Sequence, residues 1–185
     1  QRAPIKTSIL ANPNSPLVAN YQYCQNYIAS ALSATGTNLL WYSSATGGAG
    51  TSVAPIPSTT QAGSFSFWVS QSNGNCESAR AEIVVTVLPA PHSDVLENKS
   101  ICDGGTVTLD AGGGFSAYEW NTIPVQSSRQ IIVTSAGKYT VKLTGSNGCT
   151  AFQTVEVTNG VTPNVTNIKS GENFLEISAE GGNPP

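Results

Sequence analysis

One short pattern occurs twice in the chain and constrains its fold more than any other feature. The first copy, residues 63–76, reads GSFSFWVSQSNGNC, and the second, residues 137–149, reads GKYTVKLTGSNGC. Each copy has a glycine, apolar residues at alternate positions, an Asn-Gly pair and a cysteine. Alternation is typical of a strand with one buried face, and Asn-Gly favours a tight hairpin turn because both residues tolerate a positive φ. The pattern therefore predicts one β-hairpin used twice, and so an internal repeat.

The composition of the 185-residue chain is typical of strands and turns. Only 10% of the residues are charged, Met is absent, and the chain has 18 Gly and 11 Pro. No window shows the sustained periodicity of a helix, and no apolar run approaches the roughly 20 residues that a membrane span needs. The net charge of −3 argues against nucleic acid as a partner. We therefore expect an all-β protein that binds no nucleic acid and does not insert into a membrane.

Short strand candidates separated by turn residues surround both hairpins. Such spacing is the pattern of an antiparallel β-sandwich. The strand candidates are residues 29–34, 38–42, 81–88, 106–110, 117–120, 130–134, 154–158 and 174–179. Trp41 and Trp120 occupy similar places in the two copies, where each indole can be buried between two sheets.

The same patterns predict how the chain divides. Residues 1–18 are a lead-in strand or the end of a preceding module. Module one covers residues 19–89 and module two residues 90–160. Pro89-Ala90-Pro91 forms a stiff linker between them, because proline fixes φ. Residues 161–185 are the start of a third, incomplete module.

The four cysteines, two in each copy, suggest an oxidising location. Three pairings are possible, and the repeat favours Cys24–Cys76 and Cys102–Cys149, so that each sandwich holds one disulfide. Each bond would stabilise its module by about 4 kcal/mol in the chain-entropy model. Because the second cysteine of each copy follows the turn, we expect the bond at one end of the sandwich or on its final strand. The alternative is four reduced, buried cysteines.

Residues that carry catalysis or bind metals are sparse, and we predict no catalytic residue, no metal site and no cofactor. The single histidine, His92, lies beside the linker and is interpreted as a solvated linker residue. No Cys or His pair has the spacing of a zinc site. Asp103 and Asp110 are isolated acids, so they do not form a calcium loop, although a calcium site built from backbone carbonyls stays open.

An exposed aromatic side chain is the better candidate for ligand binding. If Phe65 and Phe67 point inward, Trp68 points outward, at the position that Lys142 takes in module two. An exposed indole can stack on a sugar ring or anchor a protein partner. The alternative interpretation is that Trp68 packs against a neighbouring loop or module.

Several motifs in order resemble a known family. They are YCQN at residues 23–26, LWYSSATGG at 40–48, WVSQ at 68–71 and CESARAEIVVTV at 76–87. These closely resemble a bacterial Ig-like module, and ICDGGTVTLDAGGGFSAYEW with SAGKYTVKLTGSNGC in module two resembles its sister type. Both types occur in tandem in very large secreted surface proteins of Bacteroidetes, which often end in a gliding-motility-associated sorting domain for type IX secretion. The segment NTIPVQSSRQ at 121–130 departs from the usual pattern.

The resemblance implies a non-enzymatic segment of a large secreted or cell-surface protein, at the outer-membrane exterior of a Gram-negative bacterium. Its Ig-like modules would act as spacers or weak binding modules in adhesion or gliding motility. The implied partners are neighbouring Ig-like modules of the same chain, a glycan or cell-surface protein, and the secretion machinery that exports the chain as cargo. A second hypothesis is an accessory carbohydrate-binding segment of a secreted polysaccharide-degrading enzyme, with Trp68 as part of its sugar platform.

Overall fold

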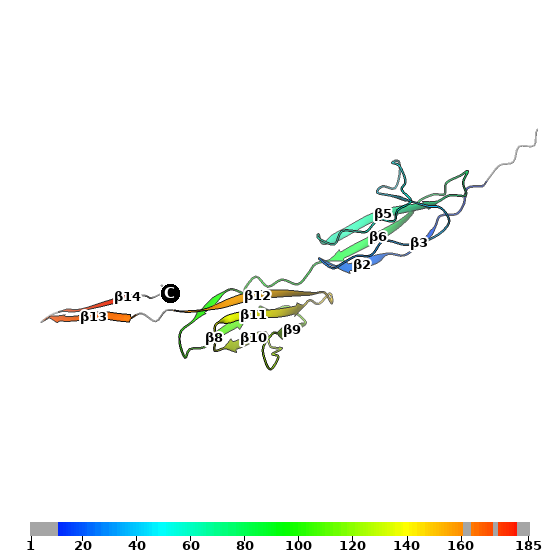
Figure 1. Cartoon of the computed structure of the whole chain (residues 1–185). Helices are drawn as coiled ribbons and strands as arrows, with labels where there is room; N and C mark the ends of the chain where they lie inside the picture. The colour runs from blue at the N-terminus through cyan, green and yellow to red at the C-terminus, as the bar shows by residue number, and fades with distance from the viewer. Residues whose placement is uncertain (1–10, 161–163, 172–173, 181–185) are drawn as a thin grey trace, which may run out of the picture. The chain divides into compact units, whose positions relative to one another are not determined.

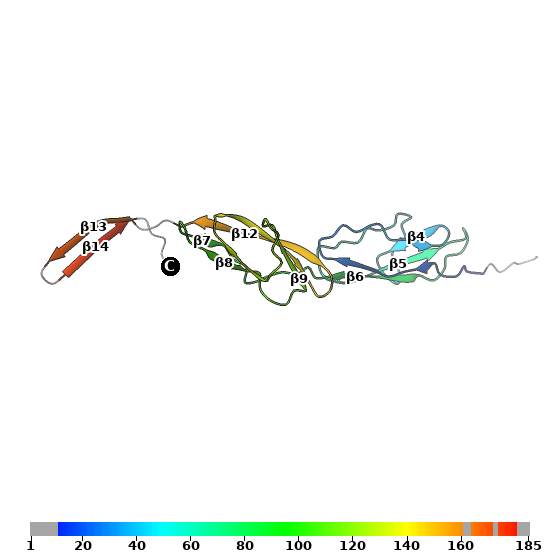
Figure 2. The same ribbon diagram turned by 90° about the horizontal axis from the view of Figure 1, so that it is seen from below.

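Strands are the only regular elements in the described part of the chain (Figure 1; Figure 2). The computed structural model describes residues 11–160, together with the backbone of residues 164–171 and 174–180. The chain divides into two compact units, Gln1–Ala90 and Pro91–Pro185. This division falls within the predicted Pro-Ala-Pro linker. The exact module boundaries stay predictions.

The first unit carries module one, which is built on a four-stranded sheet in the order β2-β6-β5-β4. β1 and β3 form a separate two-stranded sheet whose Val18 and Ala34 pack against the same core, so residues 17–18 of the lead-in pair within this unit. The strands are β1 (Leu17–Val18), β2 (Tyr21–Cys24), β3 (Ala34–Thr35), β4 (Leu39–Tyr42), β5 (Gly63–Gln71) and β6 (Ala81–Leu88).

The alternating residues of β5 and β6 explain why this sheet has one buried face. In the antiparallel register Phe65 lies opposite Val85 and Phe67 opposite Ile83, and directly opposed residues share a face. Ile83 and Val85 have no exposed surface, while Phe65 and Phe67 are half-buried and pack against the core. The predicted inward direction of both phenylalanines is therefore correct.

Module two in the second unit repeats this arrangement, with a four-stranded sheet in the order β7-β12-β11-β9 and a second sheet of β8 and β10. Its strands are β7 (Lys99–Ile101), β8 (Val107–Asp110), β9 (Ala117–Trp120), β10 (Gln130–Val133), β11 (Gly137–Thr144) and β12 (Thr150–Asn159). Both modules are thus two-layered β-sandwiches, as the sequence predicts.

One strand pair in each sandwich is parallel, which the antiparallel expectation missed. β2 pairs in parallel with β6, and β7 pairs in parallel with β12. In each case the first strand of the main sheet lies beside the last strand of the module. The two strands run in the same direction, so the chain enters each sheet at one end and leaves it at the opposite end.

A hairpin of β13 (Asn164–Gly171) and β14 (Phe174–Glu180) follows module two. The strand candidate at residues 174–179 coincides with β14. The other residues of the predicted third module (161–163, 172–173 and 181–185), like residues 1–10 of the lead-in, lie outside the described residues. A third module therefore stays a prediction.

Each sandwich buries one tryptophan, from the strand that pairs with the first strand of its long hairpin. Trp41 on β4 is 3% exposed and Trp120 on β9 is 1% exposed. The indole N–H of Trp120 donates a hydrogen bond of 2.9 Å to the carbonyl of Ser128, which precedes β10 in the second layer. The prediction that both indoles are buried is confirmed.

Both Asn-Gly pairs lie in tight turns, closed by backbone hydrogen bonds from Asn73 to Cys76 and from Gly145 to Cys149. In the second hairpin the N–H of Gly145 donates to the carbonyl of Cys149, and only Gly148 has a positive φ, at 80°. Asn147 contributes its side chain instead, because its Oδ1 accepts the N–H of Cys149 at 3.0 Å. The pair was therefore a correct signal for a tight turn, although a positive φ is present only at its glycine.

The separate cores predict that the two modules unfold independently once disulfides are reduced. Trp120→Ala should destabilise module two by about 3–5 kcal/mol through the lost contacts and the remaining cavity. Trp41 and Trp68 remain in this variant, so their fluorescence in a denaturant titration should report module one at its wild-type midpoint. Trp41→Ala is the matched control, with Trp120 reporting module two. A shift of both midpoints in either variant would contradict separate cores.

Candidate functional site

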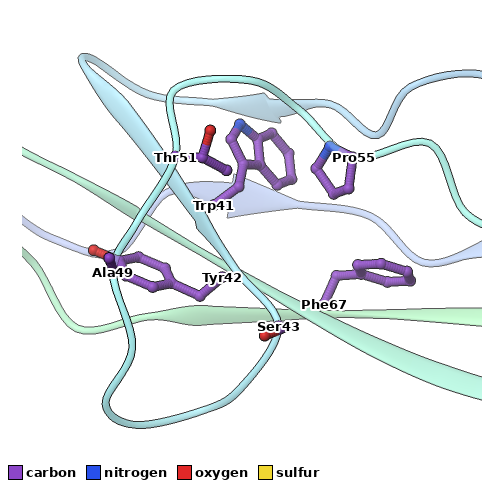
Figure 3. A pocket seen from close by; sticks show the side chains of 7 residues that line it. All are labelled: Trp41, Tyr42, Ser43, Ala49, Thr51, Pro55 and Phe67. Carbon is purple, nitrogen blue, oxygen red and sulfur yellow. The ribbon is translucent and has the colours of Figure 1, made fainter.

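The candidate binding site of module one is an apolar pocket of about 260 Å³ beside β4 (Figure 3). Residues of β4, of the loop that follows it and of β5 form its wall. These residues are Trp41, Tyr42, Ser43, Ala49, Thr51, Pro55 and Phe67. In Figure 3 the indole of Trp41 and the ring of Pro55 lie beside each other, with the ring of Phe67 beneath Pro55.

Backbone hydrogen bonds hold the loop of residues 43–51 against β4. The N–H of Trp41 donates to the carbonyl of Thr51 at 2.8 Å, and the N–H of Thr51 donates to the carbonyl of Trp41 at 3.0 Å. Gly50 lies against the ring of Tyr42, where a Cβ would come within 2.6 Å of ring atoms. Backbone hydrogen bonds and the close packing of Gly50 therefore hold the loop in place, and the pocket wall is formed in advance of any ligand.

A network of polar contacts surrounds Tyr42. Its hydroxyl donates to the carboxylate of Glu77 at 2.5 Å, and the hydroxyl of Ser70 donates to the same carboxylate oxygen at 2.6 Å. The guanidinium carbon of Arg80 lies 3.3 Å from the centre of the Tyr42 ring, a cation–π contact, and Arg80 also donates to the carbonyl of Ser44 at 2.7 Å. These contacts join the loop, β5 and the hairpin.

The electrostatics of this network favour an ionised carboxylate. The hydrogen bond from Ser70, then that from Tyr42, and then the charge of Arg80 lower the pKa of Glu77 below its ordinary value. A carboxylate with a lowered pKa is a poor general base near neutral pH. Glu77 therefore acts as an anchor for Tyr42 and the pocket wall.

Trp68, the ligand contact predicted from sequence, lies on the other face of β5. It stands opposite Tyr42 on β4 and Glu82 on β6 in the sheet register, and it is half-buried. It does not line the pocket beside β4. A role for Trp68 in binding stays a prediction, while the pocket residues were not predicted from sequence because the loop that completes the pocket has no regular pattern.

The remaining candidates for chemistry are dispersed. His92 is largely exposed, and its Nε2 lies 3.6 Å from a carboxylate oxygen of Asp94. Asp110 is occupied: Arg129 donates two hydrogen bonds to it at 2.8 Å each, and Gln130 donates a third at 2.8 Å. No group of three His, Cys, Asp or Glu side chains suited to a metal ion occurs among the described residues.

The cysteines lie at the ends of the sandwiches, but the favoured pairing within each module is wrong. Cys24 is level with Leu88, the last residue of β6, whereas Cys76 precedes the first residue of that strand. The length of β6 separates them by more than about 20 Å, while disulfides need Cα atoms within about 7 Å. Cys76 is accordingly a free cysteine.

Module two repeats this separation. Cys102 follows β7, which pairs with the end of β12, and Cys149 directly precedes the start of β12. Cys102 is a free, exposed cysteine, whereas Cys24 and Cys149 are disulfide-bonded. The pairing predicted from the repeat is therefore wrong, because the two cysteines of one module lie at opposite ends of its main sheet. That all four cysteines form disulfides in the whole protein stays a prediction.

Two β-sandwiches, each with parallel first and last strands in its main sheet, define a protein of the Ig-like class. More particularly, residues 13–89 match the family described as "Ig-like domain CHU_C associated". This match over residues 13–89 agrees with the resemblance to a bacterial Ig-like module that the sequence shows.

Solved structures that resemble the chain include the Ig domains of a cell adhesion molecule and a Bacteroides ovatus protein. The eight N-terminal Ig domains of Down Syndrome Cell Adhesion Molecule are 13% identical with a TM-score of 0.32, over 91% of this chain and 28% of that one. DIP-gamma IG1+IG2 is 10% identical with a TM-score of 0.35, over 80% of this chain and 98% of that one.

A third similar structure is that of Bacteroides ovatus SGBP-B in complex with a mixed-linkage heptasaccharide. It is 17% identical with a TM-score of 0.27, over 77% of this chain and 44% of that one. The chain thus spans less than half the length of the cell adhesion molecule and SGBP-B chains. At these scores the likenesses carry no argument about function.

No curated protein matches the chain. Among the described residues there is no helix with the length and apolar character needed to cross a membrane.

The contacts of Asp110 predict an acid-sensitive stability for module two. Hydrogen bonds from Arg129, then Gln130, and the N–H of Gly112 hold the pKa of Asp110 well below its ordinary value. A lowered pKa in the folded state contributes stability above the ordinary value, near pH 4, and this contribution is lost as the pH falls toward the folded-state value. Asp110→Asn should therefore destabilise module two at pH 7, with a gap to wild type that narrows below about pH 4.

The midpoint of denaturation is measured through Trp120 fluorescence in a Trp41→Phe, Trp68→Phe background. Asp103→Asn, which removes an exposed carboxylate in the turn after β7, is the control. A gap between Asp110→Asn and wild type that is constant from pH 7 to pH 2 would contradict the stabilising role of the ionised carboxylate.

Proposed function

We propose that the chain is a non-enzymatic structural and adhesive segment of a large secreted or cell-surface protein, in which Ig-like modules act as spacers. The observation that carries this proposal is the parallel pairing of the first and last sheet strands in each module. A module that the chain enters at one end and leaves at the other adds its own length to the protein.

The linker supports the same function. β6 ends at Leu88, and Pro89-Ala90-Pro91 directly follows. Two prolines fix φ at two of three positions, so few backbone torsions are left to bend the chain between the modules. Gln25 restricts the linker further, because its side-chain oxygen accepts the N–H of Ala90 at 3.3 Å. A short and restricted connection suits a segment that holds other domains away from a surface.

The family supports the location in this proposal. The CHU_C-associated Ig-like domain in residues 13–89 is consistent with an extracellular or surface protein. We propose the outer-membrane exterior of a Gram-negative bacterium, reached as cargo of the type IX secretion machinery. Neighbouring Ig-like modules of the same chain would be its constant partners, and a glycan or a cell-surface protein would be bound through weak contacts in adhesion or gliding motility.

A spacer requires that the linker limits bending, which small-angle X-ray scattering can measure. Replacing Pro89 and Pro91 together by glycine should broaden the distribution of interatomic distances and reduce the maximum dimension, because glycine frees φ at both positions. The proteins are compared in reductant, so that disulfides do not contribute. Ala90→Gly, which keeps both prolines, is the control and should resemble wild type. Indistinguishable scattering from the double variant and wild type would oppose the spacer proposal.

The alternative function is an accessory carbohydrate-binding segment of a secreted polysaccharide-degrading enzyme. The observation that favours it is the apolar pocket beside β4, with the half-buried ring of Phe67 in its wall. Aromatic rings present flat apolar surfaces to which sugar rings bind by stacking. Polar groups are also at hand, because Ser43 and Thr51 line the same pocket.

The adjacent residues Phe67 and Trp68 lie on opposite faces of β5, so a substitution at each one tests a different possible sugar site. The wild-type chain is first tested on an array of neutral oligosaccharides. If the pocket binds sugar, Phe67→Leu should weaken binding at least tenfold through the loss of the ring, whereas Trp68→Leu should retain it. The opposite result would favour the Trp68 platform. A wild-type chain that binds no oligosaccharide would reject the alternative function.

A further inference from the structure

The outer face of the main sheet in module two carries a second hollow, with a volume of about 160 Å³. It lies entirely within the second unit, and its residues come from β9, β11 and β12 and from the loop that follows β9. The residues with exposed surface that line it are Glu119, Asn121, Val125, Thr140, Lys142 and Phe152.

Three of these side chains form a row across the strands. In the antiparallel register Phe152 lies opposite Lys142, and Lys142 lies opposite Glu119, so all three share one face. This face is the outer one, because Val141 and Leu143, the neighbours of Lys142 on β11, have no exposed surface. The Nζ of Lys142 lies 3.5 Å from a carboxylate oxygen of Glu119. The row therefore places an aromatic ring beside one hydrogen-bond donor and one acceptor.

A second row of hydroxyl and amide groups lies beside the first. The hydroxyl oxygens of Thr140 and Thr154 are 2.7 Å apart, and either one can be the donor. The N–H of Thr140 donates to Oδ1 of Asn121 at 2.7 Å, which fixes the end of β9 against β11. Two hydroxyls that share one hydrogen keep the other hydrogen for a ligand. This row thus adds uncharged groups that both donate and accept.

The loop after β9 holds Val125 in the wall of the hollow. The N–H of Trp120 donates to the carbonyl of Gln126 at 2.8 Å and closes the base of the loop. Inside it the hydroxyl of Thr122 donates to the carbonyl of Pro124 at 2.9 Å and accepts the N–H of Gln126 at 3.1 Å. The loop is therefore formed in advance of any ligand. It belongs to the segment 121–130, which departs from the family pattern in the sequence.

Two apolar side chains of the hollow stay in contact with solvent. Phe152 is 71% exposed and Val125 is 64% exposed. β11 lies between β9 and β12, so Phe152 and the loop of Val125 come from opposite sides of β11. Neighbouring strands are about 4.8 Å apart, which puts β9 and β12 about 10 Å apart. Covering both side chains with one flat ligand over β11 would remove apolar surface from water.

The polar groups of the hollow suit a neutral ligand rich in hydroxyls. The charges of Lys142 and Glu119 balance each other, so an ionic ligand of either sign gains little. A pyranose ring has hydroxyls that donate and accept hydrogen bonds, and its C–H groups pack on aromatic rings. The volume of about 160 Å³ is below the roughly 300–1,000 Å³ of pockets for larger ligands, which leaves room for a single ring.

We propose that this face of module two binds one sugar ring of a neutral glycan. Phe152 is the stacking platform, and Lys142 and Glu119 bond to the sugar hydroxyls. The inference rests on the glycan partner in the proposed function and deepens it, and it is independent of the spacer role. The site is separate from the pocket beside β4 and from Trp68, which both belong to module one.

An NMR titration of the ¹⁵N-labelled 185-residue chain with neutral hexasaccharides of glucose, mannose or galactose tests the site. A hexasaccharide that binds should shift the amide signals of residues 119–126, 140–142 and 152–154. Phe152→Leu, which removes the ring and keeps an apolar side chain, should raise the Kd about tenfold. Lys142→Met, which removes the donor and keeps the stem, should also raise it. Ile132→Leu, at an exposed apolar residue of β10, is the matched control and should keep the wild-type Kd.

Several results would overturn the proposal. One is a wild-type Kd in Phe152→Leu, and another is a set of shifts confined to module one. Sedimentation that shows a dimeric wild-type chain and a monomeric Phe152→Leu variant would assign the face to a protein partner instead. Shifts in module one that are lost in Phe67→Leu or Trp68→Leu would reject this site and keep the glycan partner. The absence of binding to every hexasaccharide would reject both, while the scattering experiment tests the spacer role separately.

Discussion

The burial of one indole between two thin layers is the interaction on which each sandwich depends. Trp41 and Trp120 each lie on the strand that pairs with the first strand of the long hairpin, and each is almost completely buried. In module two the indole also donates a hydrogen bond to the second layer, so the same side chain fills the core and fixes the loop before β10. Modules of this size bury little apolar surface, and one large side chain therefore supplies a large share of the core. The direction of every alternating residue on the neighbouring strands follows from which face the indole covers.

The parts of the fold that could be predicted are those whose signal lies within one strand. The segment AEIVVTVL coincides with β6, and AYEW coincides with β9, because large apolar residues recur at every second position along both. The short strands β2 and β7 were missed: their stability comes from parallel pairing with residues more than fifty positions away, which no local pattern contains. The candidate 29–34 is a strand only at its last residue, because its neighbours are held by single contacts such as that of Leu32 with the carbonyl of Pro55.

The candidate sites likewise contain features that a local sequence pattern predicts and features that depend on distant residues. The direction of Phe67 and Trp68 could be predicted from alternation alone, but the pocket beside β4 could not, since a glycine-rich loop completes it through backbone hydrogen bonds. The cysteines are more instructive. Their number in each repeat indicated pairs within each copy, whereas the parallel strands place the two cysteines of one copy at opposite ends of the sheet. Sequence spacing fixes which cysteines correspond between copies, and only topology decides which of them can meet.

The parallel pairing of first and last strands also determines how a module responds to mechanical load. Tension along the chain pulls β2 from its first residue, Tyr21, and β6 from its last residue, Leu88, and these two residues lie at opposite ends of their shared ladder. The strands are thereby sheared past each other, so their backbone hydrogen bonds carry the force together instead of opening one after another from a free end. β7 and β12 have the same geometry in module two. Resistance to pulling thus resides in the short strands β2 and β7, where the chain is held by hydrogen bonds loaded along the strand direction.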